Sequence, residues 1–140
     1  MTAATSFGTM QAEIESLQRV YAALNANDID AVMREFDPNI VWMEPWDPPM
    51  GGTWRGIDEV APHFARSRNK WAEGRCEAYR FVPAGEKVVV FIDVNVRLEG
   101  ENEFRTGRHA SVYTFRGGKA VEQRIFEDEG AALAFAGVRS

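Results

Sequence analysis

Residues 87–99 read Lys-Val-Val-Val-Phe-Ile-Asp-Val-Asn-Val-Arg-Leu-Glu, and their alternation is the clearest structural signal in the chain. The even positions from Val88 to Leu98 are all apolar, whereas the odd positions change from apolar to polar along the segment. Because successive side chains of a β-strand point to opposite faces, this pattern predicts a long strand with one fully buried face.

Three further strands are expected around this one, over residues 75–82, 104–116 and 120–127, with Gly117-Gly118 as a hairpin turn. A connection of even length, over residues 100–103, pairs even positions of the long strand with odd positions of the next. His109 and Ser111 would then share the inner face with Ile92 and Val94; an odd connection would invert this. The outer face would carry the polar set Asp93, Asn95, Arg97, Thr106 and Arg108.

In the last strand, the side chains that alternate toward the inner face look like the wall of a pocket. These are Val121, Gln123, Ile125 and Glu127. The opposite set, Ala120, Glu122, Arg124 and Phe126, suits a solvent-facing surface or a dimer contact.

Helical periodicity dominates the first half of the chain. Residues 10–26 carry an apolar stripe, and Asp28 can cap a second, short helix. A third helix is expected after Gly56, with Asp58 as its cap and a stripe of Val60, Phe64, Ser67 and Trp71. Helices followed by a meander of long strands predict an α+β domain, with helices covering one face of a curved antiparallel sheet.

The composition limits the classes of function. A chain of 140 residues suits one domain, which we expect over residues 10–140 after a disordered tail at 1–9. The net charge of −5 argues against nucleic-acid and anionic-membrane partners. One cysteine and two distant histidines provide no metal-ligand spacing, so neither metal nor cofactor is expected. The sequence shows no signal peptide and no apolar run of about 20 residues, which predicts a cytoplasmic protein.

Residues 40–54, Ile-Val-Trp-Met-Glu-Pro-Trp-Asp-Pro-Pro-Met-Gly-Gly-Thr-Trp, carry the strongest chemical signal. A short strand delivers Glu44 into a turn that is rich in proline, glycine and tryptophan. Trp42, Trp46 and Trp54 are expected to wall a cavity, and a carboxylate among apolar walls can serve as a base or an acid. The alternative is an ion-paired or solvated loop carboxylate beside core tryptophans.

His109, on the inner strand face, is the second candidate; the alternative is a hydrogen-bonded core histidine. If Glu44 and His109 open on one cavity, they form an acid–base pair able to move a proton near neutral pH. His63 lies off the apolar stripe of its helix and is expected to face solvent, whereas Phe64 and Trp71 are expected in the core.

The order of these segments resembles the nuclear transport factor 2-like superfamily, in particular its SnoaL-like (polyketide cyclase-like) and ketosteroid isomerase-like branches. Five segments, in this order, carry the resemblance: Asn27-Asp28-Ile29-Asp30-Ala31, Val41-Trp42-Met43-Glu44-Pro45, Gly52-Thr53-Trp54-Arg55-Gly56, Val112-Tyr113-Thr114-Phe115 before Gly118-Lys119, and residues 128–137. The resemblance implies a cone-shaped half barrel with three helices, an internal pocket and a homodimer. It does not decide the function, because this fold hosts many activities.

The resemblance also assigns roles to particular residues. Glu44 falls where the isomerases carry their proton-shuttling carboxylate, and Ser111 falls where they carry an oxyanion-hole acid. Near their oxyanion-hole tyrosine, strict counting reaches Val20, with Tyr21 as the next residue. Glu127 resembles the position of a catalytic carboxylate in cyclase-type relatives; capping or solvation is the alternative.

Two hypotheses follow for the function. The first is a cofactor-free acid–base catalyst of the isomerase, cyclase or dehydratase type, acting on an apolar or aromatic carbonyl compound. Glu44 would be the base and His109 its partner, with Ser111 or Tyr113 donating to the developing charge. Tyr21, Tyr113 and Gln123 could orient the ligand. The second is a non-catalytic ligand-binding or dimerisation domain with the same cavity.

Overall fold

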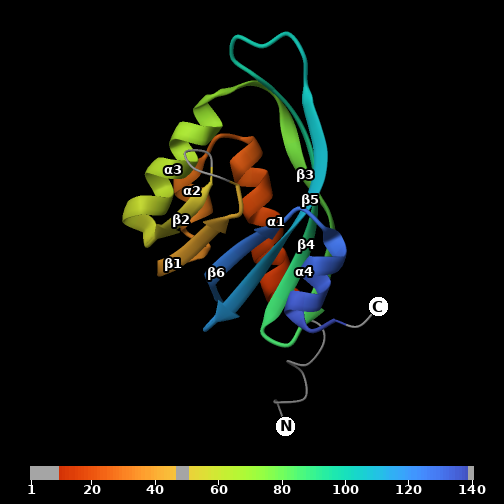
Figure 1. Ribbon diagram of the computed structural model, residues 1–140. Helices are drawn as coiled ribbons and strands as arrows, with labels where there is room; N and C mark the ends of the chain where they lie inside the picture. The colour runs from red at the N-terminus through yellow and green to blue at the C-terminus, as the bar shows by residue number, and fades with distance from the viewer. Residues whose placement is uncertain (1–9, 47–50, 139–140) are drawn as a thin grey trace.

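The computed structural model describes residues 10–46 and 51–138, which form an α+β fold (Figure 1). The described helices are α1 (Gln11–Asn25), α2 (Ile29–Met33), α3 (Ile57–Asn69) and α4 (Glu129–Ala136). The strands are β1 (Phe36–Glu44), β2 (Gly52–Arg55), β3 (Trp71–Ala84), β4 (Lys87–Leu98), β5 (Arg105–Arg116) and β6 (Lys119–Phe126). The predicted tail, residues 1–9, lies outside the described residues.

The six strands form one sheet in the order β2-β1-β6-β5-β4-β3. Strands β3 to β6 make an antiparallel meander, while β1 joins β6 in parallel and pairs antiparallel with β2. Figure 1 shows α1, α2 and α3 on one side of this curved sheet and α4 on the other. The predicted α+β fold class is therefore confirmed.

The register of β4 and β5 confirms the predicted faces. Val90 pairs with Ser111 and Ile92 with His109, while Asp93 pairs with Arg108 on the other face. The connection covers residues 99–104, which is longer than the predicted 100–103. Its length is still even, so the alternation is preserved.

The main core lies between the inner face of the sheet and helices α1 to α3. Leu17 and Val20 of α1 are fully buried there against Val88, Val90 and Ile92 of β4. Burying branched apolar side chains of this size contributes about 1.5–3 kcal/mol each to folding. This packing fixes the distance between helix and sheet around the cavity described below.

A second, smaller core lies on the outer face of the sheet. Ala132 of α4 is buried against Val89, Phe91, Ala110 and Val112. The outer face of β6 is covered as well, because the rings of Phe126 and Phe135 lie 5.3 Å apart. The expected three helices are therefore joined by a fourth, α4. It covers the part of the outer face that was predicted to face solvent or a dimer partner.

Of the two predicted helix caps, Asp28 is confirmed and Asp58 is wrong. Asp28 caps α2 by accepting a hydrogen bond from the backbone N–H of Ala31 at 3.1 Å, as predicted. Asp58 does not cap α3; Gly56 holds that position at φ 77°, which a glycine adopts without strain. Helix α3 ends at Asn69, so Trp71 opens β3 instead of extending the helix, and β3 begins before the predicted Arg75.

Candidate functional site

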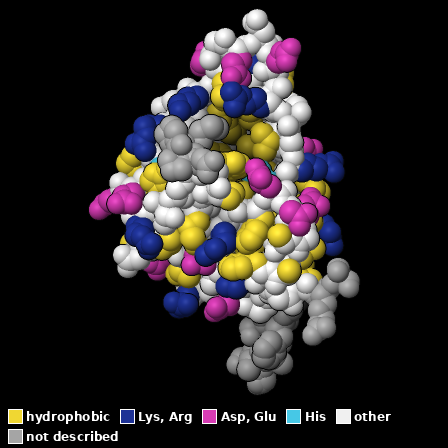
Figure 2. Space-filling model, in the orientation of Figure 1, with side chains coloured by type: hydrophobic (Ala, Val, Ile, Leu, Met, Phe, Trp, Pro, Cys, Tyr) yellow, Lys and Arg dark blue, Asp and Glu magenta, His cyan; other side chains and the backbone are white. Residues whose placement is uncertain are grey.

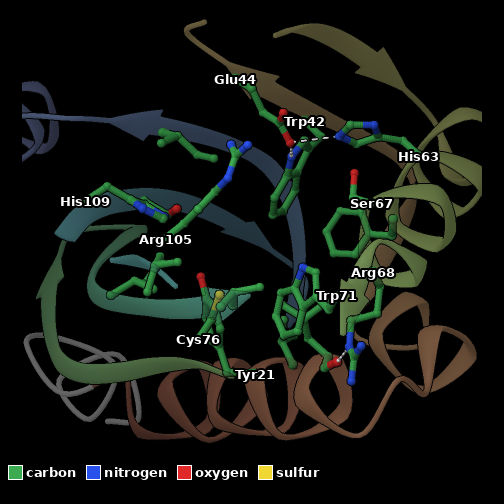
Figure 3. Close-up of a pocket in the computed structure, with 18 of the residues that line it drawn as sticks. Tyr21, Trp42, Glu44, His63, Ser67, Arg68, Trp71, Cys76, Arg105 and His109 are labelled. Atoms are coloured by element: carbon green, nitrogen blue, oxygen red, sulfur yellow. Dashed lines mark hydrogen bonds and ion pairs between the residues drawn. The ribbon is translucent and has the colours of Figure 1, made fainter. Parts of the chain in front are cut away.

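A cavity of about 320 Å³ lies between α1, α3 and the inner face of the sheet. Figure 2 shows a hollow with hydrophobic side chains inside it and charged side chains around it. Most of the lining is apolar, with polar groups concentrated at a few points (Figure 3). The polar and aromatic lining residues are Tyr21, Trp42, Glu44, Trp46, His63, Phe64, Ser67, Arg68, Trp71, Cys76, Arg105, His109, Ser111 and Tyr113.

Glu44 reaches the cavity from the end of β1. Ile40, Trp42 and Glu44 alternate toward the inner side of this strand. Oε2 of Glu44 accepts a hydrogen bond from Nε1 of Trp42 and lies 2.8 Å from Nε2 of His63. The carboxylate is therefore held by two ring nitrogens and is not a solvated loop residue.

The prediction that His63 faces solvent is wrong. His63 is buried, and its ring stacks on Trp54 with centroids 3.6 Å apart and planes at 15°. The side chains of Glu44 and His63 are only 14% and 11% exposed, respectively. The helical signal was present, because His63 follows Val60 by three residues and precedes Ser67 by four, which places all three on neighbouring parts of one helix face.

His109 lines the same cavity as Glu44, as the inner-face assignment required. The hydrogen bond of Glu44, however, is made by His63 of α3, and Figure 3 places His109 on the sheet wall away from His63. Burial lowers the pKa of His109, and the negative charge of Glu44 opposes this only in part. His109 is therefore a neutral imidazole at pH 7, with one N–H to donate.

Three buried hydroxyl groups lie deep in the cavity. The phenol oxygens of Tyr21 and Tyr113 are 2.8 Å apart, and Ser111 is buried beside them on β5. Burial raises the pKa of both tyrosines, and the hydrogen bond with Tyr113 lowers that of Tyr21 in part. All three groups are neutral donors at physiological pH. The resemblance left open whether Val20 or Tyr21 corresponds to the oxyanion-hole tyrosine of the isomerases. Both residues line the cavity.

Of the other residues predicted to contact a ligand, some line the cavity and some do not. Trp42 and Trp46 line the cavity, whereas Trp54 supports His63 from behind. Glu127 is exposed and outside the lining; its Oε2 accepts a hydrogen bond from Nε1 of Trp46 at 2.9 Å. Gln123 is fully buried next to Trp42 in the β1–β6 register and does not line the cavity.

Sequence reasoning missed several lining residues besides His63. Trp71 was expected in the core, but it is only half-buried and lines the cavity, with the guanidinium of Arg68 4.4 Å from its ring centroid. Arg68 also donates to the backbone oxygens of Leu24 and Asn25, at 2.8 Å each. This arginine therefore links α3 to the end of α1 and to the start of β3.

Within residues 10–46 and 51–138, no cluster of three or more metal-ligating side chains could hold a metal ion. No helix of this part of the chain is long and apolar enough to cross a membrane. The described residues that could act on a ligand are thus acid–base and hydrogen-bonding groups in an apolar hollow.

Solved structures with the same fold come from several sources. TerC, co-crystallized with polyporic acid, is 23% identical at a TM-score of 0.75, covering 91% of this chain and 99% of that one. An NTF2-like protein from Burkholderia thailandensis is 25% identical at a TM-score of 0.72, covering 91% and 98%. A ketosteroid isomerase-like fold from Catenulispora acidiphila, in complex with trimethylamine, is 17% identical at a TM-score of 0.71, covering 89% and 94%.

No curated protein sequence matches this chain. The family model of the SnoaL-like domain matches residues 17–123. That range runs from α1 to β6 and includes Glu44, His63 and His109 on the cavity walls. With a match over more than half of its length, and with the NTF2-like fold around an internal cavity, the chain belongs to the SnoaL-like domain family.

Proposed function

We propose that this chain binds a small, largely apolar carbonyl compound in its cavity and moves a proton beside that carbonyl group without a cofactor. The observation that carries the proposal is the carboxylate of Glu44, held by His63 and Trp42 on the wall of an otherwise apolar cavity. Such a cavity lies at the small end of the range for ligand sites, which is about 300–1,000 Å³. It suits a ligand with one or two rings.

Glu44 is the proposed base. Among the described residues, both of its hydrogen bonds end on Oε2, and none ends on Oε1. Oε1 is therefore the atom that would take a proton from the carbon next to the carbonyl. His63 and Trp42 hold the carboxylate in one orientation. A base that is already oriented loses less entropy in reaching the transition state than one that rotates freely.

The electrons of the broken C–H bond would move to the carbonyl oxygen, which then needs a hydrogen-bond donor. Neutral His109 and the hydroxyl groups of Ser111 and Tyr113 are the donors available on the sheet wall. In an isomerisation, Glu44 would return the proton to another carbon. In a dehydration, the same enolate would re-form the carbonyl and break the bond to a β-hydroxyl group, which would leave as water with the proton that Glu44 had taken up. This revises the first hypothesis: His63 replaces His109 as the partner of Glu44, and His109 becomes a donor.

The relatives support a small-molecule ligand. TerC was crystallized with polyporic acid, and the Catenulispora protein with trimethylamine. At 23% and 17% sequence identity, these two proteins share the fold with this chain, but their ligands do not identify its substrate. The proposed ligand class therefore depends on the residues that line the cavity.

Hydrogen–deuterium exchange tests the chemistry without a known product. 2-Tetralone, an apolar ring ketone with acidic α-protons, would be incubated with the protein in deuterated buffer and followed by proton NMR. The native protein should raise the exchange rate above buffer. Glu44→Gln should lower the enhancement of the exchange rate by about 10²-fold or more. Binding, measured by quenching of tryptophan fluorescence, should persist.

Each result decides between the two functions. Exchange by Glu44→Gln at the native rate would refute the assignment of the base. Binding without any enhanced exchange would favour the non-catalytic binding domain. Glu77→Gln is the matched control, since this exposed carboxylate lies opposite Asp93 on the outer face of the sheet, outside the cavity, and should leave exchange nearly unchanged.

A further inference from the structure

Arg105 brings a positive charge to the wall of the cavity. It is the first residue of β5 and pairs with Val96 of β4. Alternation along β5 places Arg105 on the same inner face as His109 and Ser111. Arg105 lines the cavity, and Figure 3 shows its side chain on the same side as His109.

The strand between Arg105 and His109 carries no side chain on this face. Gly107 occupies the intervening inner position, opposite Val94 in the register. A methyl group added at Gly107 would meet no atom within 4 Å, so space is open there. Since a strand rises about 3.3 Å per residue, about 13 Å separates the α-carbons of Arg105 and His109. A flat ligand could lie along this bare stretch.

The guanidinium of Arg105 retains donors for a ligand. Its Nε and Nη2 donate to the carboxylate of Glu101 at 3.0 and 2.6 Å, and among the described residues Nη1 has no partner. The side chain is 56% exposed. Arg68, the other arginine of the lining, donates to two backbone oxygens and stacks on Trp71. Arg105 is thus the lining arginine that is positioned to receive a ligand.

We infer that the ligand of this cavity carries an anionic group, of carboxylate type, at the end opposite its reacting carbonyl, and that Arg105 binds this group. The inference rests on the proposed function, because it names the ligand class of the same cavity. Glu101 occupies the Nε–Nη2 edge of the guanidinium, so a ligand carboxylate would accept from Nη1 and the second N–H of Nη2. Charge-assisted hydrogen bonds of this kind are stronger than neutral ones. The carbonyl end would lie toward His109 and Glu44, and the apolar body along Val94 and Gly107.

Two matched probes test this by isothermal titration calorimetry. 2-Acetonaphthone is a neutral ring ketone, and 6-acetyl-2-naphthoate is the same ketone with a carboxylate at the far end of the ring system. The native protein should bind the naphthoate more tightly. Arg105→Met should weaken naphthoate binding about three- to tenfold, the range for an exposed charge-assisted contact, and should leave acetonaphthone binding unchanged. Added salt should weaken naphthoate binding in the native protein and much less in Arg105→Met.

Arg108→Met is the matched control, because Arg108 lies on the outer face of the same strand with its side chain 65% exposed. It should change the affinity for neither probe. The inference fails if the native protein does not prefer the naphthoate, if Arg105→Met weakens both probes equally, or if Arg108→Met has the effect of Arg105→Met. A preference for the naphthoate without enhanced exchange of 2-tetralone would overturn the proposed catalysis and leave this inference standing. Failure of both probes to bind would overturn both.

Discussion

Substituting Tyr113 by phenylalanine removes one hydroxyl from the pair at the base of the cavity and leaves the ring in place. Tyr113 is fully buried and Tyr21 is 8% exposed, and their oxygens lie 2.8 Å apart. A neutral hydrogen bond contributes about 1 kcal/mol, and the partner left behind adds desolvation of about 1–3 kcal/mol when it is buried. Because Tyr21 lines the cavity and keeps 8% of its surface exposed, we expect a loss near the lower end, about 1.5–2 kcal/mol. For a domain of this size, that lowers Tm by about 5–8 °C.

A double-mutant cycle in urea separates the hydrogen bond from other effects. Tyr21→Phe should cost about as much as Tyr113→Phe, and the double variant should cost about 1 kcal/mol less than their sum, because it strands no hydroxyl. Tyr79→Phe is the control; this residue is 43% exposed and bonds to Glu129 on the surface, so we expect a change below about 0.5 kcal/mol. Strict additivity of the two single losses would refute the reasoning.

Three further predictions follow from the site and the fold. Since burial lowers the folded-state pKa of His109, its unfolded form binds the proton first. The stability that His109 contributes is present above the unfolded pKa of about 6.5 and is lost as pH falls toward the folded value. The free energy of unfolding, measured in urea, should therefore fall less steeply below pH 6.5 for His109→Asn than for the native protein. Arg68→Ala should lower the free energy of unfolding by about 1–3 kcal/mol by removing two backbone hydrogen bonds and the stack on Trp71, whereas Arg66→Ala, an exposed neighbour, should change it by less than about 0.5 kcal/mol. We expect a homodimer, so light scattering at micromolar concentration should report twice the chain mass of 15.7 kDa; a single-chain mass would contradict this.

Alternation made the sheet predictable. Six apolar even positions from Val88 to Leu98 mark the inner face of the strand, and the register of β4 with β5 follows once the connection has an even length. The inward positions of His109, Ser111 and Tyr113 could therefore be predicted from local pattern alone. The added helix α4 was harder, because it is short and covers only a small apolar patch around Ala132.

The partner of Glu44 could not be read from local pattern. Helix α3 has an apolar stripe broad enough to bury either His63 or a neighbouring position, and only its packing against β1 brings His63 within 2.8 Å of a carboxylate 19 residues earlier. Choosing between His63 and His109 required knowing which element crosses the cavity beside the end of β1. That choice depends on the angle of a helix on a curved sheet, which is a long-range property of the fold.

The sequence by itself determined the α+β class, the inner and outer faces of the long strands, and the aromatic segment that carries Glu44, because each of these depends on neighbouring residues and a fixed period. The tertiary structure alone decided that His63 bonds to Glu44, that Trp54 supports His63, and that Arg105 and His109 share one wall with Gly107 between them. These contacts join segments whose relative placement is set by core packing, and core packing is a property of the whole chain.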